Sequence, residues 1–267
     1  MKQFKTYKSE GLFLSEKTLR ALLEPLRDQT NEIADEYFRR HFFRYLETLK
    51  RIPVYKGMKV LDIGTLPGTM PTVLKRLGAV AYGIDIDPDR YGFSKKMRSE
   101  GISLLTCNFA EEQLPFSDEM FDIILFTEVI EHMLTDPQKI LNEIYRVLRT
   151  DGLLVVTTPN VASLRNRLKL LLGKNVHPKN FYTVPYLYQR HYYEYTMSEL
   201  EDRLGRAGFS IQTKAYLPAY ERALRHKLHS FGVRQNLMGR IISLVYSHLV
   251  YIIPAWKSFI FIAGIKK

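Results

Sequence analysis

From residue 59 to residue 160 the sequence alternates short apolar runs with longer amphipathic segments. Each apolar run has the length of one buried strand, and the segments between them carry apolar residues at helical spacing. The runs expected to form strands are KVLDIG, AVAYGID, ISLLTCN, FDIILFTE and LLVVTTPN, and the segments expected to form helices are 69–78, 89–101 and 136–152. Such alternation indicates right-handed βαβ units and therefore a Rossmann-like, doubly wound, mostly parallel α/β sheet.

Helices are also expected before this region. Segment 15–26 begins with Ser15, a suitable N-cap, and segment 34–52 carries aromatic residues at helical spacing. Pro53 and Gly57 end the helical pattern. We therefore expect residues 1–56 to form an N-terminal helical lid and residues 57–267 to form the main domain. The aromatic stripe is interpreted as packing; it comprises Tyr37, Phe38, Phe42, Tyr45 and Leu49.

After Asn160 the alternation becomes less regular. A helix is expected over residues 161–173, a long aromatic loop over 174–195, and a helix that begins with a capping box at Thr196 and Glu199. Two further strands, FSIQTKAY and KSFIFIAGI, bring the expected sheet to seven strands. Between them lies a basic helical insertion, residues 218–255. Long loops and insertions commonly carry the substrate side of a site.

The composition is that of a globular protein and excludes disorder and fibrous repeats, with 46% hydrophobic and 12% aromatic residues. A single cysteine, Cys107, excludes an intramolecular disulfide framework and fits a reducing compartment. The first residues, MKQFKTYKSEGLFLSEK, lack the apolar run of a signal peptide, and the apolar stretch 237–253 is interrupted by Arg240 and His248. These features predict a cytoplasmic protein, with peripheral attachment to a membrane left open.

Almost all of the net charge of +11 lies near the C-terminal end of the sequence. Residues 1–202 are almost neutral, whereas residues 203–267 contain eleven basic side chains and one acidic side chain, Glu221. Such a basic lobe suits an anionic membrane surface, a phosphorylated substrate or RNA, or it is simply a solvated face. An apolar stripe at helical spacing within the lobe suits an interfacial helix or packing on the sheet; it comprises Leu237, Ile241, Leu244, Val245, His248 and Ile252.

Three strand ends carry residues suited to a nucleotide-like cofactor. A glycine-bearing turn runs from Asp62 through Gly64 to Gly68, and glycines there let backbone N–H groups approach a ligand. Asp85 ends the next strand at a distance that suits a carboxylate binding ribose hydroxyls. Asn108 and Phe109 follow the third strand, where they suit hydrogen bonding and stacking of an adenine.

Together, VLDIGTLPG, GIDID, LPFSDEMFDIILFTEVIEHM and RVLRTDGLLVVTTPN resemble the class I S-adenosylmethionine-dependent methyltransferases. The resemblance covers about residues 59–209 and implies S-adenosylmethionine as cofactor. It departs from the family at Leu66, which replaces a glycine, and at Asn108, which replaces an aspartate, so we expect weaker cofactor binding. The alternative, an NAD(P) dehydrogenase, lacks G-x-G-x-x-G. The expected cofactor residues are Asp62, Gly64, Thr65, Gly68, Asp85, Ile86, Asn108, Phe109 and Thr127.

TEVIEHM places two carboxylates and an imidazole just after the fourth expected strand. If this segment is helical, Glu128, Glu131 and His132 share one face and offer a mixed nitrogen and oxygen site for Mg²⁺, Mn²⁺ or Zn²⁺. The alternative is that Glu128 orients the cofactor while Glu131 and His132 position the next helix.

A later histidine, His191, precedes the run YYEYT. Small-RNA 3′-terminal ribose 2′-O-methyltransferases have a similar histidine after Glu-x-x-Glu-His, and ubiquinone-pathway O-methyltransferases share the latter motif. This resemblance implies that Glu128, Glu131, His132 and His191 bind Mg²⁺ or Mn²⁺, which would activate an acceptor hydroxyl. Without a metal, His132 or His191 is a candidate general base. The expected catalytic residues are His132, His191 and Glu131.

The function predicted from the sequence is methyl transfer to an oxygen of a small-molecule or glycan/lipid-linked acceptor. A metal-dependent ribose 2′-O-methyltransferase acting on RNA is the first alternative. A non-catalytic docking protein with a degenerate cofactor pocket is the second. Acceptor residues lie on variable loops, so the sequence leaves the acceptor open.

Overall fold

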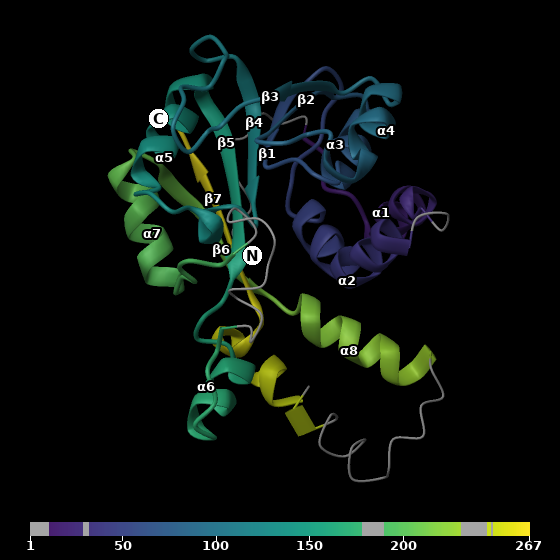
Figure 1. Ribbon diagram of the computed structural model, residues 1–267, viewed down its shortest axis with the longest axis vertical. Helices are drawn as coiled ribbons and strands as arrows, with labels where there is room; N and C mark the ends of the chain where they lie inside the picture. Colours follow the sequence, from purple (N-terminus) through teal and green to yellow (C-terminus); the bar gives the residue numbers. More distant parts are fainter. Residues whose placement is uncertain (1–10, 29–31, 178–189, 231–244, 247) are drawn as a thin grey trace.

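The computed structural model describes residues 11–28, 32–177, 190–230, 245–246 and 248–267 (Figure 1). Most of the expected aromatic loop lies outside these residues. The same holds for Leu237, Ile241 and Leu244 of the expected stripe and for Arg240. No helix among the described residues is long and apolar enough to cross a membrane.

Seven strands form a single sheet in the order β3-β2-β1-β4-β5-β7-β6, which confirms the expected doubly wound fold. Neighbours from β3 to β5 are parallel, whereas β7 runs antiparallel to both β5 and β6. The strand order reverses at β1 and β4, which is where ligands bind in such sheets. The strands are β1 (Lys59–Ile63), β2 (Val80–Asp85), β3 (Ser103–Thr106), β4 (Phe121–Thr127), β5 (Leu148–Pro159), β6 (Ser210–Leu217) and β7 (Phe259–Ile265).

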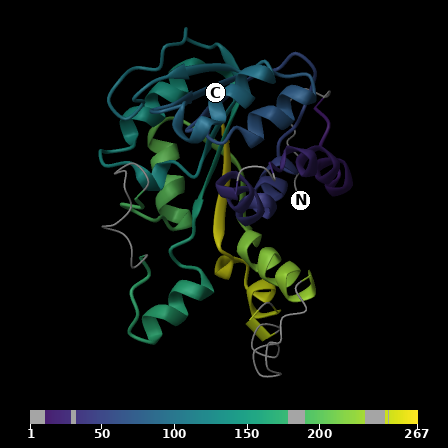
Figure 2. The same cartoon turned by 45° about the vertical axis from the view of Figure 1, so that its right-hand side comes forward.

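Helices cover both faces of the sheet (Figures 1 and 2). Alternate residues of each strand enter different hydrophobic cores, so Val155 packs with the helices α1 to α3 and Val156 packs with α5 and α7. The α-helices are α1 (Glu16–Leu23), α2 (Glu32–Leu49), α3 (Thr69–Arg76), α4 (Phe93–Ser99), α5 (Gln138–Val147), α6 (Leu164–Leu171), α7 (Met197–Arg206) and α8 (Ala219–Ser230). The short 3-10 helices are η1 (Glu24–Leu26), η2 (Arg90–Gly92), η3 (Ile130–His132) and η5 (Pro254–Trp256).

The expected helix over residues 136–152 is shorter than its sequence pattern indicates. Helix α5 ends at Val147, and Leu148 is already extended and pairs with Phe121 of β4. Asp151 has a left-handed backbone, with a φ of 59°, beside Gly152. The helical spacing of apolar residues therefore extends beyond Val147 into residues whose backbone forms the start of β5. By contrast, the caps at Ser15 and at Thr196 form as expected.

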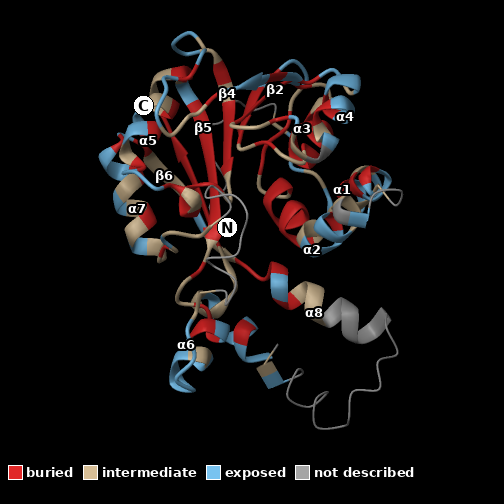
Figure 3. Cartoon of the chain, in the orientation of Figure 1, coloured by how far each residue is buried: buried red, intermediate tan, exposed pale blue. Residues whose placement is uncertain are grey.

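The N-terminal helices share their hydrophobic core with the sheet. Leu46 and Leu49 of α2 are buried in the same cluster as Val60 of β1 and Leu217 of β6. Figure 3 shows the buried residues concentrated in the central strands and along α2. Helices α1 and α2 therefore pack as part of the body of the protein.

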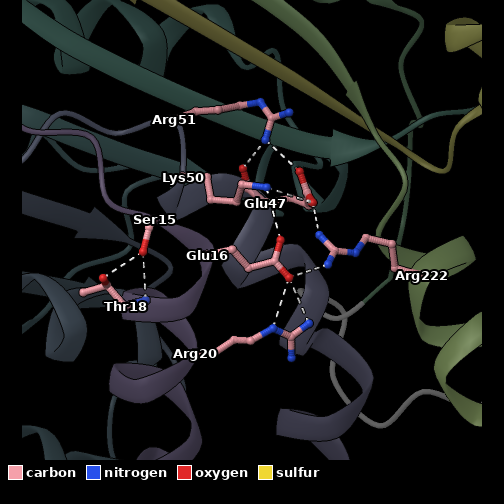
Figure 4. A network of polar contacts seen from close by, with 8 residues as sticks. All are labelled: Ser15, Glu16, Thr18, Arg20, Glu47, Lys50, Arg51 and Arg222. Carbon is pink, nitrogen blue, oxygen red and sulfur yellow. Dashed lines mark hydrogen bonds and ion pairs between the residues drawn. The ribbon is translucent and has the colours of Figure 1, made fainter.

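A polar network joins α1, α2 and α8 (Figure 4). The Arg222 guanidinium donates to Glu16 of α1 at 2.7 Å and also to Glu47 of α2. Arg51 donates to Glu47 at 2.9 Å, and Lys50 lies 3.3 Å from Glu16. The hydrogen bond from Arg222 is the largest cause that lowers the pKa of Glu16 to about 2. The start of the basic insertion is thus held against the two N-terminal helices by ion pairs.

Candidate active site

A cavity of about 840 Å³ lies at the carboxyl ends of β1, β2, β4 and β5. Its size is in the range of small-molecule and cofactor sites. Helix α2 closes one side of it. Eight of the nine expected cofactor residues line this cavity, namely Asp62, Gly64, Thr65, Asp85, Ile86, Asn108, Phe109 and Thr127. The ninth, Gly68, lies at the start of α3 instead, with a φ of 83°.

The turn after β1 requires glycine for two reasons. Gly64 has a φ of 69°, a conformation that other residues rarely adopt. In addition, a Cβ atom at this position would lie 2.5 Å from Cγ2 of Val129, so the space is already filled. Because glycine allows this close approach to Val129, the turn after β1 can form part of the cavity wall, as its glycine pattern indicates.

Two buried carboxylates lie in the cavity wall. Oδ2 of Asp62 accepts a hydrogen bond from Oγ1 of Thr65 at 2.9 Å, and burial, followed by the charge of Asp85, raises the pKa of Asp62 to about 7. Oδ1 of Asp85 accepts from the backbone N–H of Asp87 at 3.1 Å, and burial raises its pKa as well. A cationic or hydroxyl-rich ligand would compensate these carboxylates for the water they have lost.

Asn108 follows β3 and has its side chain held in place. Its Nδ2 donates to a carboxylate oxygen of Glu111 at 3.2 Å, so Oδ1 remains as an acceptor. Phe109 lines the same part of the cavity. The pair can therefore offer one acceptor and one aromatic face to a flat heterocycle.

Glu131, His132 and His191 come together in the wall of the same cavity. One ligand atom from each lies within 4.8 Å of the others. Glu131 is fully buried; its Oε2 accepts from Oγ1 of Thr158 at 2.9 Å, whereas its Oε1 has no hydrogen-bond partner in the described part of the chain. Buried polar atoms are almost always paired, so this oxygen is available to a group that enters the cavity.

The histidine rings are oriented by their Nδ1 atoms. Nδ1 of His132 lies 2.9 Å from the carbonyl oxygen of Arg190, which can only accept, so this nitrogen carries the proton. Nδ1 of His191 lies 2.9 Å from Oε1 of Glu194. Nε2 is therefore the remaining nitrogen on both rings. Such second partners fix the tautomer and the direction of a ligating imidazole.

The three groups differ in charge. Burial, followed by the charge of Glu128, raises the pKa of Glu131 to about 8. Burial, with His191 nearby, lowers the pKa of His132 to about 4. For His191, burial acts to lower the pKa, but the hydrogen bond to Glu194 and the charge of Glu131 outweigh it, and the pKa is raised. The lowered pKa keeps His132 neutral near pH 7, whereas the raised pKa of His191 favours its cationic form.

The helix on which Glu128, Glu131 and His132 would share one face does not form. Glu128 has a φ of 58°, and the helix here is only the turn η3. Oε2 of Glu128 pairs with the Arg44 guanidinium at 3.1 Å, and Oε1 accepts from Thr157 at 2.9 Å. Both carboxylate oxygens are therefore engaged away from the three-residue group.

Sequence reasoning missed the contribution of α2 to the cavity. Tyr37, His41, Arg44 and Tyr45 all line it, although the aromatic residues were expected only to pack. Burial, with Arg44 nearby, lowers the pKa of His41 to about 2. The available signal was the presence of His41 and Arg44, three residues apart, within an otherwise aromatic stripe.

The model of a methyltransferase domain family matches residues 17–214, most of the chain. The chain belongs to this family. It is thus a member of the class I S-adenosylmethionine-dependent methyltransferase superfamily, as its motifs indicate.

Curated relatives include ubiquinone biosynthesis O-methyltransferases. The mitochondrial protein of Bos taurus is 28% identical over 194 residues, which cover 68% of this chain and 50% of that protein. The protein of Cereibacter sphaeroides (strain ATCC 17029 / ATH 2.4.9) is 32% identical over 107 residues, or 40% of this chain and 43% of that protein. The methyltransferase domain thus spans about half the length of these relatives.

Solved structures share the fold. A SAM-dependent methyltransferase from Thermotoga maritima has a TM-score of 0.56 at 20% identity, and the match covers 92% of this chain and 100% of that chain. The methyltransferase solved with the Haloferax volcanii Trm112 activator has a TM-score of 0.61 at 17% identity, covering 88% and 94%. At these identities the likeness concerns the architecture alone.

Proposed function

We propose that this methyltransferase transfers a methyl group from S-adenosylmethionine to an oxygen of a small-molecule or glycan/lipid-linked acceptor. The observation that carries the proposal is that Glu131, His132 and His191 lie in the same cavity as the cofactor residues. In that arrangement, proton-accepting or metal-ligating atoms would lie in the same cavity as the bound methyl donor. The naming of relatives as O-methyltransferases supports an oxygen acceptor.

The cavity wall offers charges and hydrogen-bond acceptors that suit the cofactor. S-adenosylmethionine supplies an electrophilic methyl group on a cationic sulfur. Asp85 would accept hydrogen bonds from its ribose hydroxyls, Oδ1 of Asn108 would accept from the adenine amino group, and Asp62 would balance its positive charge. The tight turn at Gly64 leaves the backbone close to the cavity. Leu66 also lines this wall, where it replaces a smaller residue of the family pattern.

A divalent cation fits the three-residue group. The Oε1 atom of Glu131 without a hydrogen-bond partner and the two Nε2 atoms form a mixed donor set that Mn²⁺ or Mg²⁺ can use, with remaining positions for oxygen ligands. The metal would lower the pKa of an acceptor hydroxyl. Thr158, Arg190 and Glu194 hold the three ligands in position by the hydrogen bonds described above.

Calorimetric titration of Mn²⁺ into the protein saturated with S-adenosylhomocysteine tests this proposal. We expect a one-site isotherm that is abolished in His191→Ala and retained in His248→Ala, a control histidine outside the cavity. No heat of Mn²⁺ binding, with normal binding of S-adenosylhomocysteine, would exclude the metal and leave His132 or His191 as the base. Failure to bind S-adenosylhomocysteine would overturn the assignment of the methyl donor.

A further inference from the structure

Helix α6 presents the leucines of its second half to solvent. Leu171 is 81% exposed, and Leu168, Leu170 and Leu172 are exposed as well. The polar Asn166 is buried instead, with its Nδ2 donating to the carbonyl oxygens of Asn160 and Val161. Only Leu164, at the start of the helix, is buried among its leucines, so most of the apolar residues of α6 point away from the body of the protein, unlike those of an ordinary amphipathic helix.

A second group of exposed apolar residues lies at the same end of the molecule (Figures 1 and 2). In segment 248–253, Ile252 is 72% exposed and Leu249 and Ile253 are also exposed, whereas Val250 is buried. The Asn160 side chain, just before α6, donates to the carbonyl oxygens of Ala255 and Lys257, just after this segment. We call these two groups, Leu168, Leu170–Leu172, Leu249, Ile252 and Ile253, the apolar face.

The surroundings of the apolar face carry positive charge. The sequence contains no Asp or Glu between residues 152 and 193, and none after Glu221. Basic side chains accompany α6 and the end of the second segment; they are Arg165, Arg167, Lys169, Lys174 and Lys257. Exposed leucines rimmed by cations complement an anionic lipid surface, where the former enter the acyl boundary and the latter contact headgroups.

The two elements that carry the apolar face are joined through short segments to strand ends that line the cavity. Pro159, which ends β5, and Phe259, which begins β7, both line the cavity. Helix α6 follows β5 after a short turn, and segment 248–253 precedes β7. A partner surface that contacts α6 and segment 248–253 would therefore be connected to the cavity through the ends of β5 and β7.

We propose that the apolar face docks the protein on an anionic lipid bilayer. Leucine and isoleucine side chains favour a bilayer over RNA, because they offer neither stacking rings nor hydrogen bonds to bases. The further step, that the methyl acceptor is drawn from the bilayer as a lipid-linked molecule, rests on the proposed function. The docking itself does not depend on catalysis.

The test is co-sedimentation of the full chain with phosphatidylcholine vesicles, with and without about one-third phosphatidylglycerol. We expect binding only to the anionic vesicles, weaker at high salt. The double variant Leu171→Ser/Leu172→Ser should lower the partition coefficient by about tenfold or more, and Lys174→Glu should weaken binding too. Leu12→Ser is the matched control, since Leu12 is 67% exposed but lies outside the apolar face.

Three results would overturn the proposal. These are no binding to anionic vesicles by a protein that binds S-adenosylhomocysteine, full binding by the double variant, and equal loss in Leu12→Ser. Binding of a single-stranded RNA oligonucleotide that is lost in Lys174→Glu but kept in the leucine double variant, without vesicle binding, would replace the bilayer with nucleic acid. Because binding of S-adenosylhomocysteine is measured separately, failure of docking and failure of the proposed function can be told apart.

Discussion

Individual carboxylates in this protein differ in role mainly because of their surroundings. Asp62, Asp85 and Glu131 are all buried in one cavity wall, and burial raises the pKa of each. Sequence patterns located the three because each lies at or just after the carboxyl end of a strand, where ligands bind in a parallel sheet. The partner of Glu128 was not predictable in this way, since Arg44 is distant in sequence and is brought to it only by the packing of α2.

Binding of S-adenosylhomocysteine should depend on pH through Asp62. Its pKa of about 7 in the free protein should fall when the ligand ammonium binds nearby, so affinity should rise as the pH increases from 6 to 8. Calorimetry at pH 6 in buffers of different ionisation enthalpy should show release of a proton on binding. Asp62→Asn should lose this release, whereas Asp118→Asn, at an exposed surface ion pair, should keep it.

The glycine turn offers a second prediction. Gly64→Ala combines a left-handed backbone with a clash against Val129. We therefore expect the free energy of unfolding to fall by several kcal/mol, or, if the turn shifts to relieve the clash, cofactor binding to be lost. Gly57→Ala is the control, because Gly57 has a φ of 81° but open space around it, and should cost only about 1 kcal/mol. Urea denaturation compares the two. Equal losses would mean that contact with Val129 is unimportant.

At the scale of elements, α2 joins two parts of the protein through residues three apart. Arg44 pairs with Glu128 at the cavity, and Glu47 pairs with Arg222 of α8. The strand and helix alternation was predictable, because each apolar run matches one strand. The end of α5 and the left-handed backbone of Glu128 were not predictable. The spacing of apolar residues does not show where helical hydrogen bonds end and strand pairing begins.

Removal of one partner from the buried pair should be costly. Arg44→Met leaves the Glu128 carboxylate buried without its cation, so the free energy of unfolding should fall by about 3–5 kcal/mol. Arg44→Met/Glu128→Gln should recover part of that loss, because the uncompensated charge is gone. Urea denaturation of the two single variants and the double variant gives the coupling. Additive losses would show that the pair does not act as a unit.

For the whole molecule, the net charge of the basic lobe overstates the positive charge that is available to attract a partner. Arg222 belongs to the lobe by sequence, yet it is taken up by Glu16 and Glu47 of the near-neutral part of the chain. Charge counting along the sequence could not show this, because the pairing joins residues about 200 apart. The exposed cations near α6 are therefore the better guide to partners.

Stability should depend on pH through Glu16. Its pKa is lowered from 4.5 to about 2, so its contribution is present above pH 4.5 and is lost as the pH falls to 2. Because the Glu16 side chain is partly exposed and its ion pairs are therefore screened by water, we expect Glu16→Gln to cost only roughly 1 kcal/mol at pH 7 and nothing near pH 2. Urea midpoints at several pH values test this, with Glu36→Gln in the exposed pair with Arg40 as the control.

The position of β7 has a consequence for how the chain is made. It pairs with β5 on one side and β6 on the other, although the ribosome produces it after both. Until the last of its residues emerge, β5 has an open edge and β6 has no neighbour in the sheet. The nascent protein therefore carries unpaired edges on both strands, a hazard for aggregation, and insertion of β7 pairs the open edge of β5 and one edge of β6 in a single step.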